Sequence, residues 1–173
     1  SLPLAGYGGR RGIPATGVHD DLYVKAVALR VGGRVGVMVG ADASAFARVK
    51  PFLEAMGTTI HHCGGVGTGT RTKLVNNYLA VVSCQLNAEA LALSQRFGLS
   101  LEKTLEVLYG TTAFNGQLKI AWPSKVLAGD IEPGFTIDLA HKDLSLIIEA
   151  ANAAKVPMPV GAEVFQVLGI TKA

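Results

Sequence analysis

An unbroken helical pattern over residues 70–97 limits what this chain can fold into. Neither glycine nor proline interrupts it before Gly98, and a helix of this length would span about 40 Å. The apolar positions that recur at helical spacing are Leu74, Tyr78, Val81, Val82, Leu86 and Leu93. We therefore predict a mostly α-helical domain organised around one long central helix.

Shorter helices follow this pattern. Ser100 can cap a helix that Gly110 ends, and a further short element surrounds Trp122 and Pro123. The periodicity predicts two more helices, over residues 138–154 and 160–168, separated by Pro157 and Pro159.

A small α/β unit is predicted before the long helix. Its strands are expected at residues 35–39 and 58–62, and its helix at residues 42–56. A further strand is expected before this unit, at residues 22–31. Asp42 is the expected helix cap, and Pro51 predicts a kink or an early end. Such a strand–helix–strand piece is typical of the end of an α/β sheet.

Lys73 is the candidate catalytic residue. The side chains of Asn76 and Asn77, three and four residues later, lie on the same face of a helix as Lys73. Two consecutive asparagines are mediocre helix formers, which favours a role beyond a solvated surface lysine. An ammonium beside two amides suits a small substrate with a hydroxyl or carbonyl group and an anionic end.

Composition excludes several other classes. Aromatic residues make up 6% of the chain and the net charge is only +3, which argues against nucleic-acid binding. No apolar run is long enough to cross a membrane. The two cysteines, Cys63 and Cys84, form no metal-ligand motif and suit a reducing, cytoplasmic setting. Adjacent strand residues point to opposite faces, so His61 and His62 are not expected to share a metal ion.

Residues 35–168 resemble the β-hydroxyacid dehydrogenases, the group that includes 3-hydroxyisobutyrate dehydrogenase. The motifs that carry the resemblance span residues 37–40, 48–51, 55–57, 67–77, 88–90, 129–130 and 138–144. Within the group, residues 122–127, 137–144 and 156–159 look most like the sulfolactaldehyde reductases. However, a serine of those reductases is replaced here by Ala80, which leaves the acid unassigned.

The resemblance implies a specific chemistry. Such enzymes use NAD or NADP to interconvert a small hydroxy acid and its semialdehyde. The lysine matching Lys73 is their general acid/base, Asn76 and Asn77 match substrate-binding positions, and Lys142 and Asp143 match a cofactor-binding motif. The resemblance also implies a helical second domain of the 6-phosphogluconate-dehydrogenase-like type, whose long helix joins a homodimer or higher oligomer.

The chain also departs from the family. No GxGxxG turn follows a strand, so we expect a truncated dehydrogenase that binds NAD or NADP weakly or not at all. Residues 35–66 would be the α/β remnant of a dinucleotide-binding domain, and residues 67–173 the all-helical domain. Residues 1–34 form an arm or hairpin of separate origin, which weakly resembles the start of neutral ceramidases.

Two alternatives therefore remain open. The chain could be a non-catalytic helical dimerisation module with a vestigial site, or, more remotely, a ceramidase-like hydrolase fragment. His141 is an alternative proton donor. A histidine beside a lysine and an aspartate at a helix start is, however, more often a surface or capping residue. Cys84 is expected in the core, and Trp122 in the core or the wall of the site.

Overall fold

The computed structural model describes residues 25–31, 34–130 and 132–172. Of the arm or hairpin expected at residues 1–34, residues 1–24 and the turn at residues 32–33 lie outside the described residues, and with them nearly all of the segment that resembles ceramidases. Residues 25–31 of this segment are described and form a strand.

A three-stranded sheet and one helix form the first part of the described chain. The strands β1 (Lys25–Val31), β2 (Arg34–Gly40) and β3 (Thr59–His62) lie in the order β1-β2-β3. β1 pairs antiparallel to β2, and β3 pairs parallel to it, with Val37 opposite Ile60. The expected strands and the small α/β unit are therefore confirmed.

Helix α1 (Ala43–Glu54) connects β2 to β3. The carboxylate of Asp42 caps it by accepting a hydrogen bond from the backbone N–H of Ala45 at 2.9 Å. The expected early end at Pro51 is wrong, because the helix continues to Glu54. Its Leu53 packs with Val37 and Val39 in a small core between helix and sheet.

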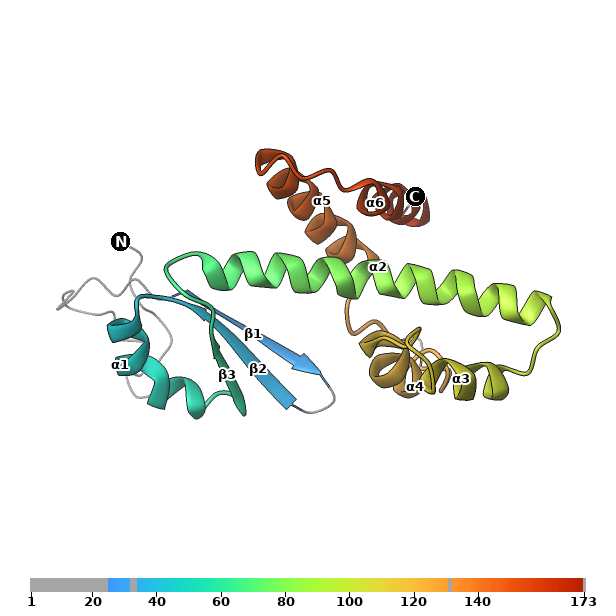
Figure 1. Cartoon of the computed structure of the whole chain (residues 1–173), viewed down its shortest axis with the longest axis horizontal. Coiled ribbons are helices and arrows are strands. Elements are labelled where there is room, and N and C mark those ends of the chain that lie inside the picture. The colour runs from blue at the N-terminus through green and yellow to red at the C-terminus, as the bar shows by residue number, and fades with distance from the viewer. Residues whose placement is uncertain (1–24, 32–33, 131, 173) are drawn as a thin grey trace.

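Helix α2 (Thr68–Arg96) is the long helix, and its 29 residues correspond to about 43 Å. In Figure 1 it runs along most of the molecule, with the sheet at its first end. A tight glycine contact fixes this junction. A Cβ on Gly40 would lie 2.8 Å from the nitrogen of Gly69, and a Cβ on Gly69 would lie 2.9 Å from the nitrogen of Gly40. Only residues without side chains allow this approach of helix to strand.

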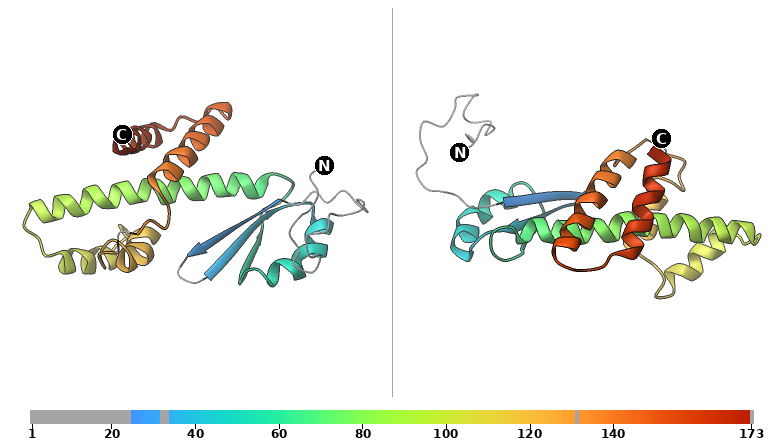
Figure 2. Two further views of the ribbon diagram at one scale, coloured as in Figure 1. Left: turned by 180° about the vertical axis from the view of Figure 1, so that it is seen from behind. Right: turned by 90° about the horizontal axis from the view of Figure 1, so that it is seen from above.

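The remaining helices pack around α2, as the two views in Figure 2 show. They are α3 (Leu101–Tyr109), the π-helix η2 (Gln117–Ala121), α4 (Trp122–Ser124), α5 (Ile137–Ala153) and α6 (Pro159–Lys172). Helices α5 and α6 form the main core with α2. Its members include Val82, Leu144 and Val164, and Leu144 is fully buried. The mostly helical fold with a long central helix is thus confirmed.

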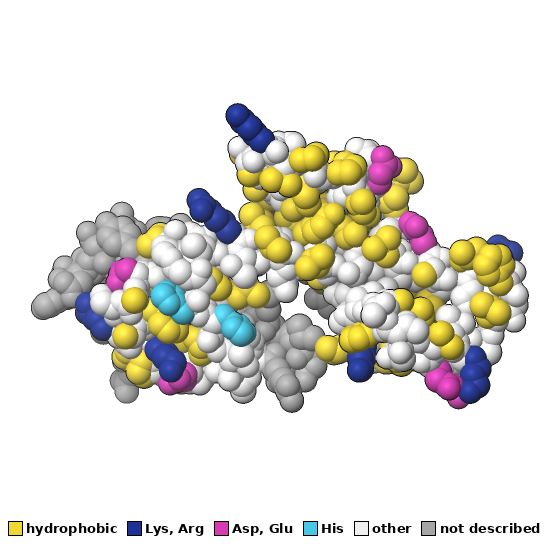
Figure 3. Space-filling view, viewed as in Figure 1, with side chains coloured by type: hydrophobic (Ala, Val, Ile, Leu, Met, Phe, Trp, Pro, Cys, Tyr) yellow, Lys and Arg dark blue, Asp and Glu magenta, His cyan; other side chains and the backbone are white. Residues whose placement is uncertain are grey.

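Many large apolar side chains of the described residues are exposed to solvent. Figure 3 shows hydrophobic side chains gathered over α5, α6 and the middle of α2. Four large apolar side chains of α2 are more than half exposed, and so is Phe97 directly after it: Val75, Leu79, Leu86, Leu93 and Phe97. Within the described ranges, no helix is both long enough and apolar enough to cross a membrane.

Candidate functional site

Lys73 lies in the first third of α2 and forms an ion pair with Asp143 of α5. Its ammonium Nζ is 2.8 Å from Asp143 Oδ2, and the side chain of Asp143 is only 5% exposed. Asn77, one turn after Lys73, donates a hydrogen bond from Nδ2 to the same oxygen at 2.7 Å. Two residues separated by 66 and 70 positions from Asp143 therefore meet on one buried carboxylate.

Lys142 approaches the other oxygen of this carboxylate. Its Nζ lies 3.2 Å from Asp143 Oδ1, and 61% of its side chain is exposed. The buried Oδ1 accepts no well-aligned hydrogen bond from the described residues. Two ammonium groups thus surround one carboxylate, so the group as a whole carries a net positive charge. We call Lys73, Asn77, Lys142 and Asp143 the lysine cluster.

The electrostatics of the lysine cluster keep Asp143 ionised. Burial by itself raises the pKa of this carboxyl. The hydrogen bonds from Lys73, Lys142 and Asn77 and the charge of Lys73 outweigh burial, so the pKa lies below its ordinary value of 3.8. Asp143 is therefore ionised at neutral pH, and its carboxylate holds the Lys73 ammonium at 2.8 Å.

Asn76 is exposed on the neighbouring face of α2 and donates a hydrogen bond from Nδ2 to Asn77 Oδ1 at 3.3 Å. The structure thus brings all five residues singled out in the sequence into one region. The side chain of Lys73 is 22% exposed while its ammonium is paired with Asp143.

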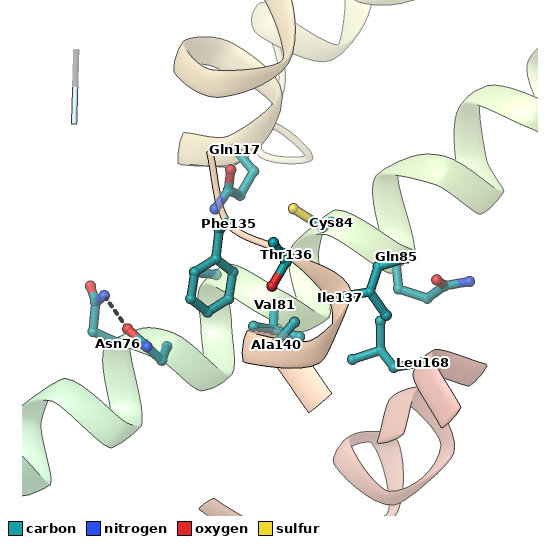
Figure 4. A pocket seen from close by; sticks show the side chains of 12 residues that line it. Asn76, Val81, Cys84, Gln85, Gln117, Phe135, Thr136, Ile137, Ala140 and Leu168 are labelled. Carbon is teal, nitrogen blue, oxygen red and sulfur yellow. Dashed lines mark hydrogen bonds between the residues drawn. The ribbon is translucent and has the colours of Figure 1, made fainter. Parts of the chain in front are cut away.

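A pocket of about 490 Å³ adjoins the lysine cluster along α2. Asn77 belongs to both, because it contacts Asp143 and also lines the pocket. Figure 4 shows the lining side chains converging from α2, η2, the segment that leads into α5, α5 itself and α6. The lining residues are Asn76, Asn77, Ala80, Val81, Cys84, Gln85, Gln117, Phe135, Thr136, Ile137, Ala140 and Leu168.

The expectation that Cys84 lies in the core is wrong. Cys84 is exposed and lines the pocket, because it follows Ala80 by one turn on the face of α2 that η2 leaves open. Protein atoms around its sulfur raise the pKa of the Cys84 thiol, and a hydrogen bond with Trp122 lowers it by less. Trp122 is half-buried and is not among the residues that line the pocket, so its expected place in the core or the wall of the site stays a prediction.

The histidines lie elsewhere. His141 stacks on Phe165, with ring centroids 4.2 Å apart, and so packs α5 against α6. His62 stacks on Phe46 and its Nε2 lies 2.7 Å from the carbonyl oxygen of Ala41. No three His, Cys, Asp or Glu side chains in the described part of the chain are grouped as metal ligands.

Sequence reasoning missed two features of the site. It placed Asp143 with the cofactor and did not pair it with Lys73, because the two are 70 positions apart and nothing local links them. It also missed Gln117, Phe135 and Thr136 in the pocket. These residues reach the pocket because η2 and α5 pack against α2. The spacing of apolar residues along one helix does not predict that packing.

Comparison with known proteins identifies relatives for most of this chain. Residues 67–173 match the family described as NAD-binding of NADP-dependent 3-hydroxyisobutyrate dehydrogenase. The 3-sulfolactaldehyde reductase of Escherichia coli (strain K12) is 42% identical over 75% of this chain and 44% of the relative. The 2-(hydroxymethyl)glutarate dehydrogenase of Eubacterium barkeri is 34% identical over 78% of this chain and 45% of the relative.

A solved structure shows the same arrangement. The 3-hydroxyisobutyrate dehydrogenase of Mycobacterium tuberculosis, determined with L-serine, superimposes with a TM-score of 0.77 and 29% identity. The match covers 86% of this chain and 55% of that protein. The chain therefore spans about half the length of the relatives it matches.

Proposed function

We propose that this chain is part of a nicotinamide-dependent oxidoreductase that acts on small hydroxy acids or semialdehydes. The proposal starts from its family, because the chain belongs to the family of NAD-binding domains of NADP-dependent 3-hydroxyisobutyrate dehydrogenase. The observation that carries this proposal is the lysine cluster beside a pocket. It supplies a held ammonium, an amide and a cavity of small-molecule size at one place.

Lys73 is the proposed general acid/base. An ammonium has three N–H donors, and the bond to Asp143 Oδ2 uses one of them. When a carbonyl substrate is reduced, negative charge develops on its oxygen, and Lys73 donates a proton to that oxygen. In the reverse direction the amine of Lys73 takes the proton from the alcohol. Asp143 fixes the position of Nζ, while Asn76 and Asn77 orient the substrate.

The residues present fit part of a nicotinamide cofactor. Lys142 is mostly exposed, and the lysine cluster has a net positive charge, so Lys142 suits an anionic group of a dinucleotide, with Asp143 beside it. The cofactor supplies or accepts the hydride when bound. One exposed lysine contributes only a small part of the binding energy of a dinucleotide, so we expect weak binding of NAD or NADP to this chain.

The proposed organisation assigns these roles to separate parts of the chain. Residues 67–173 form the all-helical domain that carries the lysine cluster. Residues 35–66 correspond to the end of a dinucleotide-binding domain, and residues 1–34 form an arm of separate origin. We further expect a cytoplasmic protein, in line with its unpaired Cys63 and Cys84.

A cofactor titration tests the proposal. The fluorescence of NADH and NADPH is followed while the chain is added, up to millimolar cofactor. We expect weak binding that Lys142→Ala removes. Lys103→Ala is the matched control, because Lys103 pairs only with Glu106 on the surface and should leave binding unchanged.

Absence of binding at every concentration would instead favour a non-catalytic dimerisation module. One observation supports assembly in either case. It is the exposed apolar row along α2 and its C-cap, made of Val75, Leu79, Leu86, Leu93 and Phe97. Pairing of two long helices would cover this row, so we propose a homodimer or higher oligomer. Sedimentation should show the assembly, and Leu86→Lys should weaken it.

A further inference from the structure

The pocket beside the lysine cluster contains no charged side chain. Its twelve lining residues, all within the described part of the chain, are either apolar or carry amide, hydroxyl or thiol groups. The cations of this region, Lys73 and Lys142, are absent from the lining and lie at the Asn77 end. The site is therefore polarised, with positive charge at one end and a neutral cavity at the other.

Hydrogen bonds anchor one wall of the neutral cavity, the π-helix η2. Gln117 belongs to the π-helix η2, a rare conformation that often occurs at functional sites. Asn87 and Asn115 exchange two side-chain hydrogen bonds of 3.1 and 2.7 Å, which attach the start of η2 to α2. Asn115 Oδ1 also accepts a hydrogen bond from the backbone N–H of Leu118. These bonds fix the backbone that presents Gln117 to the pocket.

Gln117 lies beside an apolar wall. Figure 4 shows its amide reaching toward Phe135, with Thr136 and Cys84 nearby. Amide and hydroxyl groups can donate hydrogen bonds to an uncharged oxygen of a substrate, but they cannot neutralise the charge of a carboxylate or sulfonate. Moving such an anion out of water without a cation beside it is strongly unfavourable.

On the basis of the proposed function, we infer that this chain selects a β-hydroxy acid or semialdehyde whose substituent is uncharged and largely apolar. The reacting oxygen lies at Lys73, and the substituent occupies the pocket along α2. Gln117 and Phe135 are the specificity-determining residues. A second acidic group on the substituent would have no cation to meet in the pocket.

The chain contains two convenient reporters of this pocket. Trp122 is its only tryptophan and lies close enough to Cys84, which lines the cavity, to affect the pKa of that thiol. In a Cys63→Ser background, Cys84 is the remaining thiol and can be labelled with a chromogenic disulfide reagent. A bound substituent should slow this labelling and shift the Trp122 emission. Neither readout requires turnover.

The experiment compares two acids that differ in charge at the substituent. The first is 2-(hydroxymethyl)-3-methylbutanoate, with a branched alkyl group, and the second is 2-(hydroxymethyl)glutarate, with a carboxyethyl group. We expect the first acid to protect Cys84 from labelling at concentrations about tenfold lower, or lower still, than those the second acid requires. Ala80→Arg places a cation in the pocket and should reverse the preference. Leu79→Arg adds the same charge outside the lining and should not.

The outcomes separate this inference from the proposed function. Equal or tighter protection by the dicarboxylate, or no protection by either acid, overturns the neutral-substituent inference. Lys73→Met should weaken both acids alike and leave their ratio unchanged, because it acts at the other end. The cofactor titration tests the oxidoreductase proposal independently, and its failure would leave the protection ratio as it is.

Discussion

Replacing Lys73 with methionine should destabilise the fold by about 2–3 kcal/mol at neutral pH. The change keeps a long apolar stem but removes the ammonium that lies 2.8 Å from a carboxylate with 5% exposure. Breaking a buried ion pair by removing one partner costs about 3–5 kcal/mol. The lower range applies here because Asn77 and Lys142 still contact Asp143.

The measurement is urea unfolding followed by far-ultraviolet circular dichroism. Lys103→Met is the control, because Lys103 and Glu106 form an exposed pair that should contribute less than about 1 kcal/mol. Combining Lys73→Met with Asp143→Leu should recover part of the loss, since no charge is then left buried. A Lys73→Met variant that loses no more stability than Lys103→Met would refute the reasoning.

The same pair makes stability depend on pH with a definite sign. The folded pKa of Asp143 lies below its ordinary value of 3.8. Its contribution to stability is therefore complete above 3.8 and is lost as the pH falls through the lower folded pKa. Lys73 makes the largest contribution that lowers this pKa, so the pKa of Asp143 should be higher in Lys73→Met than in the wild type. The stability difference between the two proteins should therefore shrink as the pH falls from the pKa of the variant through that of the wild type. A difference that grows there would contradict the assignment.

Three further predictions concern packing and charge. Gly40→Val should lower the free energy of unfolding by at least about 2 kcal/mol, measured by thermal unfolding, because the new Cβ would lie 2.8 Å from a backbone nitrogen. The control Gly36→Ala should be nearly neutral, because a Cβ there meets nothing within 4 Å. Asn115→Ala should cost about 1–3 kcal/mol by leaving the Asn87 amide buried without its partner, and should speed hydrogen exchange at the Leu118 amide. Asn77→Asp should place a second carboxyl against Asp143, raise the pKa of this carboxyl pair and destabilise the fold at neutral pH by about 2 kcal/mol or more, with the loss shrinking on acidification.

Local pattern predicted most of the secondary structure. The helical period from Thr70 onward and the caps Asp42 and Ser100 are properties of neighbouring residues, and the structure confirms them. Pro51 does not end α1 where it stands, because it lies in the last turn and the helix continues to Glu54.

Long-range packing accounts for what the sequence could not show. Lys73 and its amides share one helical face, which the spacing predicts. Their buried partner Asp143 comes from another helix that packs against α2. Cys84 has a core-like spacing, yet the cavity between α2, η2 and α5 exposes it. A period along one helix cannot reveal where a neighbouring helix leaves space.

The central claim is that Lys73 delivers a proton to the substrate oxygen, and hydride transfer tests it most directly. The chain is incubated with a semialdehyde and millimolar NADH or NADPH that is deuterated at the reactive ring carbon, and the deuterated hydroxy acid is quantified by mass spectrometry. The account predicts product from the wild type and about 10²–10⁴-fold less from Lys73→Ala. Equal product from both proteins, or none from the wild type above the protein-free background, would contradict it.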